Sequence, residues 1–179
     1  AQLVSSAAWI FPFRERIPCV GAALALIELE AGSAGPARRL LESLRADDWR
    51  RLREDPELLG SASWLAQICT RLEDADFAAA LHDRLAPYGD RIGGFYAVAC
   101  RGSFARYLGL LARTAGRLAE AERWFAIAVE ANRAIDATIY VAWSQLDWAE
   151  TIALGGTVEG RERARSLAAE AQRSARSIG

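Results

Sequence analysis

The stretch RYLGLLARTAGRLAEAERWFAIAVE, residues 106–130, decides the fold that the chain can adopt. Its first half places apolar residues at helical spacing, at Leu108, Leu111 and Ala112. Gly116 interrupts that pattern, and a second apolar stripe follows, made of Leu118, Ala121, Phe125, Ala128 and Val129. The stretch therefore predicts two amphipathic helices joined by a tight turn.

Two glycines stand in this helical stretch, although glycine costs about 1 kcal/mol relative to alanine inside a helix. Gly116 is expected to end the first helix in the left-handed conformation, as a C-terminal glycine does. Gly109 lies within the first helix, and we expect the partner helix to approach too closely there for a side chain. The two glycines thus predict different features of one helix pair.

The pattern recurs along the chain. Residues 23–44 align on residues 107–128 with a constant offset of 84. Two further copies complete a series of matched alanines spaced by 43, 41 and 43 residues: Ala37, Ala80, Ala121 and Ala164. The sequence predicts one domain over residues 1–179 with four helix pairs, at approximately 15–46, 61–88, 100–133 and 138–178. No stretch alternates convincingly with the period of a strand, so the expected fold class is all-α.

Paired helices with a small residue in the first, a glycine at the turn and an alanine five residues later resemble the tetratricopeptide repeat (TPR). The third unit carries the pattern in Leu108, Gly109, Gly116, Ala121, Phe125 and Ala128. Trp64 stands at the family's aromatic position in the second unit, whereas Ala105 stands there in the third. Arg133 replaces the usual closing proline, and the period is about 42 residues where the family has about 34. The resemblance implies a right-handed α–α superhelix that binds a protein or peptide partner.

A narrower resemblance covers residues 81–133, which look like the C-terminal repeat region of large bacterial signalling ATPases. Those regulators join an NTPase module to a LuxR-type helix-turn-helix domain or to an adenylate cyclase domain. The resemblance implies a non-enzymatic sensing or scaffolding region of a larger bacterial regulator. Its partner would be a protein, a peptide or a small effector.

The composition removes several kinds of chemistry. All 22 basic residues are arginine and the net charge is −1, so no lysine is present for a phosphate loop or a Schiff base. Arginines alternate with acids, which argues against direct contact with nucleic acid. A single histidine and three widely spaced cysteines predict no metal site, no cofactor and a reducing cytoplasm. No apolar run is long enough to span a bilayer, so no membrane partner is expected.

The candidate binding surface lies on the first helices of the third and fourth units, because first helices line the inner face of such a superhelix. Helical spacing puts Arg106, Leu110 and Arg113 on one side of the third unit, and the fourth unit supplies Trp143, Asp147 and Glu150. Together they predict a mixed-charge patch with an aromatic floor, suited to a peptide or a small acidic ligand. The alternative is that the arginines pair with the carboxylates and Trp143 simply packs.

Two other functions stay open at this point. Exposed terminal units could stack to form a homo-oligomer. An enzyme could use a carboxylate site built from the acidic clusters Asp47–Asp48, Glu54–Asp55 and Glu73–Asp76, although carboxylates near helix ends usually cap them. The lone histidine, His82, is expected at the surface or at a helix interface, with no catalytic role.

Overall fold

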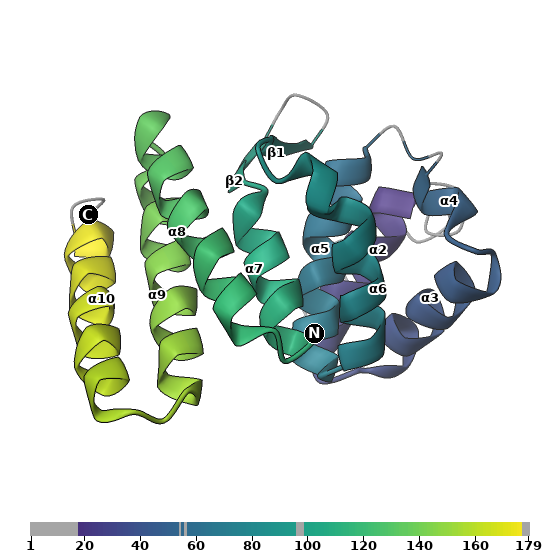
Figure 1. The fold of residues 1–179 in the computed structure, drawn as a ribbon. Coiled ribbons are helices and arrows are strands. Elements are labelled where there is room, and N and C mark those ends of the chain that lie inside the picture. Colours follow the sequence, from purple (N-terminus) through teal and green to yellow (C-terminus); the bar gives the residue numbers. More distant parts are fainter. Residues whose placement is uncertain (1–17, 54, 56, 96–98, 177–179) are drawn as a thin grey trace.

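The computed structural model describes residues 18–53, 55, 57–95 and 99–176. Residues 15–17 of the first expected unit and 177–178 of the fourth lie outside these ranges. The described residues are predominantly helical, which confirms the all-α class, and the helices follow one another in pairs (Figure 1). No described helix is both long and apolar enough to cross a membrane.

Each expected unit contributes one helix pair. The pairs are α2 (Pro18–Glu30) with α3 (Gly35–Ala46), α5 (Leu58–Leu72) with α6 (Ala75–Leu85), α7 (Ala105–Thr114) with α8 (Leu118–Ala134), and α9 (Thr138–Leu154) with α10 (Val158–Arg176). The first helix of a pair also packs on the pair before it: α5 on α2, α7 on α5 and α6, and α9 on α8. Residues from α2 to α8 share one continuous hydrophobic core, while α9 and α10 add a smaller cluster.

The helix pairs turn as the glycines predict. Gly116 has a φ of +77°, and its N–H donates to Arg113 O at 2.9 Å while the Arg117 N–H donates to Ala112 O at 2.8 Å. This pair of hydrogen bonds is a Schellman motif, which satisfies the last carbonyls of α7. Gly32, with a φ of +90°, ends α2 in the same way.

The second unit corrects the predicted register. The left-handed residue that ends α5 is Glu73, with a φ of 55°, and α6 begins two residues later, at Ala75. Ala78, five residues after Glu73, is the buried alanine that corresponds to Ala37 and Ala121, so the prediction of Ala80 was wrong by two residues. The alignment failed here because no glycine marks this turn.

A β-hairpin separates the second and third pairs, contrary to the expectation of no strands. Strand β1 (Ile92–Phe95) pairs antiparallel with β2 (Ala99–Ser103), after a 3₁₀ turn η2 (Ala86–Tyr88). Residues 100–103, placed in the third unit by the sequence, therefore belong to the hairpin. The hairpin and the short helix α4 (Arg50–Arg53) lengthen the spacing of the first three pairs, whereas the third and fourth pairs are spaced as widely because α8 and α9 have 17 residues each.

Candidate binding site on the first helices

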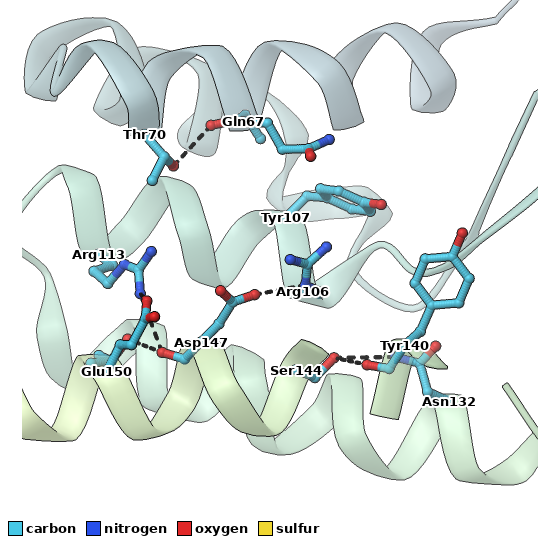
Figure 2. A network of polar contacts seen from close by, with 12 residues as sticks. Gln67, Thr70, Arg106, Tyr107, Arg113, Asn132, Tyr140, Ser144, Asp147 and Glu150 are labelled. Carbon is cyan, nitrogen blue, oxygen red and sulfur yellow. Dashed lines mark hydrogen bonds and ion pairs between the residues drawn. The ribbon is translucent and has the colours of Figure 1, made fainter. Parts of the chain in front are cut away.

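Arg106 and Arg113 lie on one side of α7, as their helical spacing predicts, and both reach α9 (Figure 2). The Arg106 Nε donates to Asp147 Oδ2 at 2.7 Å. The Arg113 Nη1 donates to Glu150 Oε2 at 2.9 Å and to the Asp147 backbone oxygen at 3.3 Å. The arginines of the third unit therefore pair with the carboxylates of the fourth unit, as the alternative interpretation predicted.

The two ion pairs differ in their exposure to water. The side chains of Arg106 and Asp147 are 12% and 13% exposed, so this pair is largely desolvated. Burial raises the pKa of the Asp147 carboxyl above its usual range, while the charges of Arg106 and Arg113 act in the opposite direction. Glu150 is 56% exposed, so its bond to Arg113 is screened and contributes less.

A cavity of about 320 Å³ lies beside these ion pairs. Three successive first helices line it, with Gln67, Thr70 and Arg71 from α5, Arg106, Leu110 and Arg113 from α7, and Asp147 and Glu150 from α9. Five of the six predicted site residues therefore meet around one cavity. Leu110 is buried and forms part of the cavity wall. The arginines, the Gln67 amide and the Thr70 hydroxyl can form hydrogen bonds with a ligand.

Trp143, the sixth predicted residue, does not line this cavity. Its ring lies beside it, with the Arg106 guanidinium 5.3 Å from the ring centroid and the Tyr140 ring at 5.2 Å edge-on. Trp143 remains 43% exposed and faces a second groove between α9 and α10. The predicted aromatic contact with the charged patch is therefore present at Arg106, but Trp143 does not form the floor of the cavity.

A row of cations and aromatic rings extends the charged patch towards α5. Arg101 of β2 lies over the rings of Trp64 and Tyr107, at 4.9 and 5.9 Å, and Arg106 lies over Tyr107 and Trp143, at 5.5 and 5.3 Å. Such contacts favour a fixed guanidinium orientation. Sequence reasoning missed Arg101 because it did not predict the hairpin, and it missed Tyr107 of α7 because its partner is Arg101.

Hydrogen bonds hold the hairpin against the helices that form the site. The Ser103 N–H donates to Asn132 Oδ1 at 2.7 Å, and Asn132 Nδ2 donates to Ser144 Oγ at 3.2 Å. The Tyr140 hydroxyl donates to Cys100 O at 2.7 Å. Gly102 approaches Tyr140 so closely that a Cβ there would lie 2.5 Å from the ring carbon Cγ. The hairpin is thus fixed to both α8 and α9, which helps to position Arg101.

His82 is buried between α6 and α8, the helix interface that was one of its two expected positions. Its Nε2 accepts a hydrogen bond from the Trp124 indole at 3.1 Å, and its Nδ1 lies 3.3 Å from Asp83 Oδ1. His82 occupies the register position of Leu41 and Phe125, four residues after the buried alanine. The His82 ring therefore helps to join the second unit to the third.

One residue of each acidic cluster has a structural role. Asp74 caps α6 by accepting from the Phe77 N–H at 3.0 Å, and Asp47 pairs with Arg51. Asp55 accepts from the Ser61 hydroxyl and from the Glu57 N–H, while Glu54 lies outside the described residues. Over the described ranges, no group of three or more His, Cys, Asp and Glu side chains is arranged to hold a metal ion.

No protein-family model matches the chain, and neither a curated protein nor a solved structure matches it. Its function is therefore inferred from its own residues.

Proposed function

We propose that the chain is a non-enzymatic binding module, built as a right-handed superhelix of TPR-like helix pairs, that receives its ligand in the cavity between α5, α7 and α9. The observation that carries the proposal is that first helices from three successive pairs contribute polar side chains to this one cavity. In repeat architectures a binding surface is assembled in this way from neighbouring units. The ligand is an acidic peptide or a small acidic effector.

The two arginines have different roles in this proposal. Arg106 is held by the buried carboxylate of Asp147 and by its aromatic neighbours, so it is a fixed part of the wall. Arg113 has an exposed partner, Glu150, which a ligand carboxylate can replace at little cost. A guanidinium has five N–H donors and binds a carboxylate through two of them at once. Arg113 is therefore the ligand-binding arginine, and Glu150 competes with the ligand.

We further propose that this module belongs to a larger cytoplasmic bacterial regulator, in which ligand binding is passed to an output domain. Residues 81–133 support this part of the proposal through their resemblance to the repeat regions of signalling ATPases. A coding sequence that joins this region to an NTPase, a DNA-binding or a cyclase domain would support it, and a freestanding gene product would contradict it.

A peptide titration followed by NMR tests the binding function. Short peptides that contain glutamate should shift the amide resonances of Gln67, Thr70 and Arg113, and glutamine counterparts should not. Arg113→Gln should weaken binding by about tenfold, the cost typical of a lost charged hydrogen bond, and Glu150→Gln should strengthen it. Arg123→Gln, at an exposed arginine of α8, is the matched control. Equal shifts in wild type and Arg113→Gln, or none with any acidic peptide, would contradict the proposal.

A further inference from the structure

A second groove, of about 600 Å³, runs between α9 and α10. Its floor is made of small side chains of α10, namely Ala168, Ala171 and Ala175, and its α9 wall carries Trp143 and Leu146. Both wall residues are conspicuously exposed for their size, at 43% and 45%. Large apolar side chains over an alanine floor form a surface on which another helix can pack closely.

The register of the repeat indicates what shape the groove accepts. Ala164 and Ala171 of α10 correspond to Ala121 and Ala128 of α8, so Gln172 and Ala175 correspond to Val129 and Asn132. On α8 these two positions are buried, α9 packs on that helix, and Asn132 donates to Ser144 of α9. On α10 the same positions are exposed. The groove therefore occupies the place where a further helix would rest on the last pair.

The edge of the groove is basic. Arg165 and Arg176 follow the helical spacing of Ala169 and Gln172, both of which line the groove, so all four share one face of α10. Arg165 and Arg176 form no ion pair with any residue that the structure describes. Helix α10 contains five arginines and three glutamates, a net charge of +2. Two copies meeting through α10 would bring like charges together, whereas an acidic helix would find complementary ones.

We propose that the α9–α10 groove is a docking site for an acidic amphipathic helix of a partner protein. The apolar face of that helix lies on Trp143, Leu146 and the alanine floor, and its carboxylates face Arg165 and Arg176. Trp143 is the central anchor, since a partly exposed tryptophan in a groove is a typical hot spot. This surface is separate from the cavity between α5, α7 and α9. The groove binds a helix, whereas the cavity binds an acidic group at Arg113.

Two synthetic peptides of about 15 residues, near the length at which an isolated helix becomes marginally stable, serve as probes. Both carry leucines at i, i+3, i+4 and i+7; one has glutamates at the remaining positions and the other has lysines. Fluorescence anisotropy should show binding of the glutamate peptide only. Arg165→Glu with Arg176→Glu should weaken it by at least about tenfold, because both rim charges are reversed. Arg123→Glu, which reverses one exposed charge on α8, should leave the affinity unchanged.

Leu146→Glu gives an independent variant, since Leu146 is exposed and its loss spares the core. It should abolish binding of the glutamate peptide and leave the melting temperature within a few degrees of wild type. Equal binding of the lysine peptide, or unchanged binding in the Arg165→Glu, Arg176→Glu variant, would overturn the proposal. A concentration-dependent dimer in light scattering that Leu146→Glu dissociates would assign the groove to a second copy and would also overturn it.

Discussion

Phe125 of α8 lies directly on the backbone of Gly109 in α7. A Cβ at residue 109 would come within 2.6 Å of Phe125 Cε1 and 2.8 Å of two neighbouring ring carbons. The Phe125 ring is fully buried, so it has no solvent-exposed position to move into. The expectation that the partner helix approaches closely at Gly109 is confirmed, and this contact sets the separation of α7 and α8.

Gly109→Ala should therefore destabilise the protein, even though alanine is the better helix former. Overpacking a core costs about 1–3 kcal/mol, and the gain in helix propensity offsets about 1 kcal/mol of that. Urea unfolding should show a net loss, and adding Phe125→Leu to Gly109→Ala should recover part of it. Gly35→Ala, where the new Cβ meets only the tip of the Arg39 side chain, is the control and should show no such loss. A Gly109→Ala protein as stable as wild type would contradict the packing role.

Glu73→Gly should stabilise the protein. Glu73 ends α5 with a φ of 55° and a ψ of 32°, the position that Gly32 and Gly116 occupy in the first and third units. A side chain in the left-handed region costs about 1–2 kcal/mol, which glycine removes while adding some entropy to the unfolded chain. We expect a net gain of about 1 kcal/mol by urea unfolding. Asp76→Gly, within α6, should be destabilising, and a loss at Glu73→Gly would refute the proposed strain.

The turns show how far the sequence alone could be used. Where glycine ends the first helix, at Gly32 and Gly116, the alignment placed the following buried alanine correctly. Where Glu73 adopts the same conformation, nothing in the sequence marks the turn, and the predicted register slipped by two residues. The hairpin was missed because Gly93, Gly94 and Gly102 hide the alternation of a strand, and its fixation to Asn132 and Tyr140 is tertiary.

Trp124→Phe should destabilise the second and third units by leaving the buried Nε2 of His82 without its donor. An unpaired buried acceptor costs about 1–3 kcal/mol. Adding His82→Leu should cost less than the sum of the two single changes, since Leu41 shows that the register position accepts an aliphatic side chain. A double-mutant cycle in urea measures the coupling. Trp148→Phe, which removes an indole bond to the partly exposed Glu122, is the control, and strict additivity at His82 and Trp124 would contradict the pairing.

The site was predictable to the extent that it is helical. Spacing along α7 and α9 correctly grouped Arg106 and Arg113 opposite Asp147 and Glu150, because positions on one helix face follow from the sequence. The contribution of α5, through Gln67 and Thr70, depends on how three pairs stack and has no local signal. Trp143 contacts Arg106 but lines the groove between α9 and α10, because spacing gives the face of a helix and does not show which groove that face borders.

Arg106→Gln should make the stability of the protein depend more strongly on pH. Burial raises the pKa of Asp147, so its charged form costs stability above the folded pKa, and that cost disappears as the pH falls towards the unfolded value of about 3.9. Removing Arg106 takes away the nearest opposing charge and enlarges the cost at neutral pH. Breaking a buried pair from one side typically costs about 3–5 kcal/mol. We expect a deficit of about 3 kcal/mol against wild type at pH 7, which shrinks as the pH is lowered towards 4.5.

Urea unfolding of both proteins at each pH measures the deficit, and comparison at the same pH cancels the titration of all other groups. Asp147→Asn combined with Arg106→Gln removes the buried carboxylate and should abolish the extra pH dependence. Both side chains are largely buried, so Arg106→Gln alone leaves the Asp147 carboxylate buried without its partner. The double variant lacks that carboxylate and should therefore be more stable than Arg106→Gln at pH 7. A deficit that stays constant or grows on acidification would show that Asp147 is not held as a buried carboxylate by Arg106.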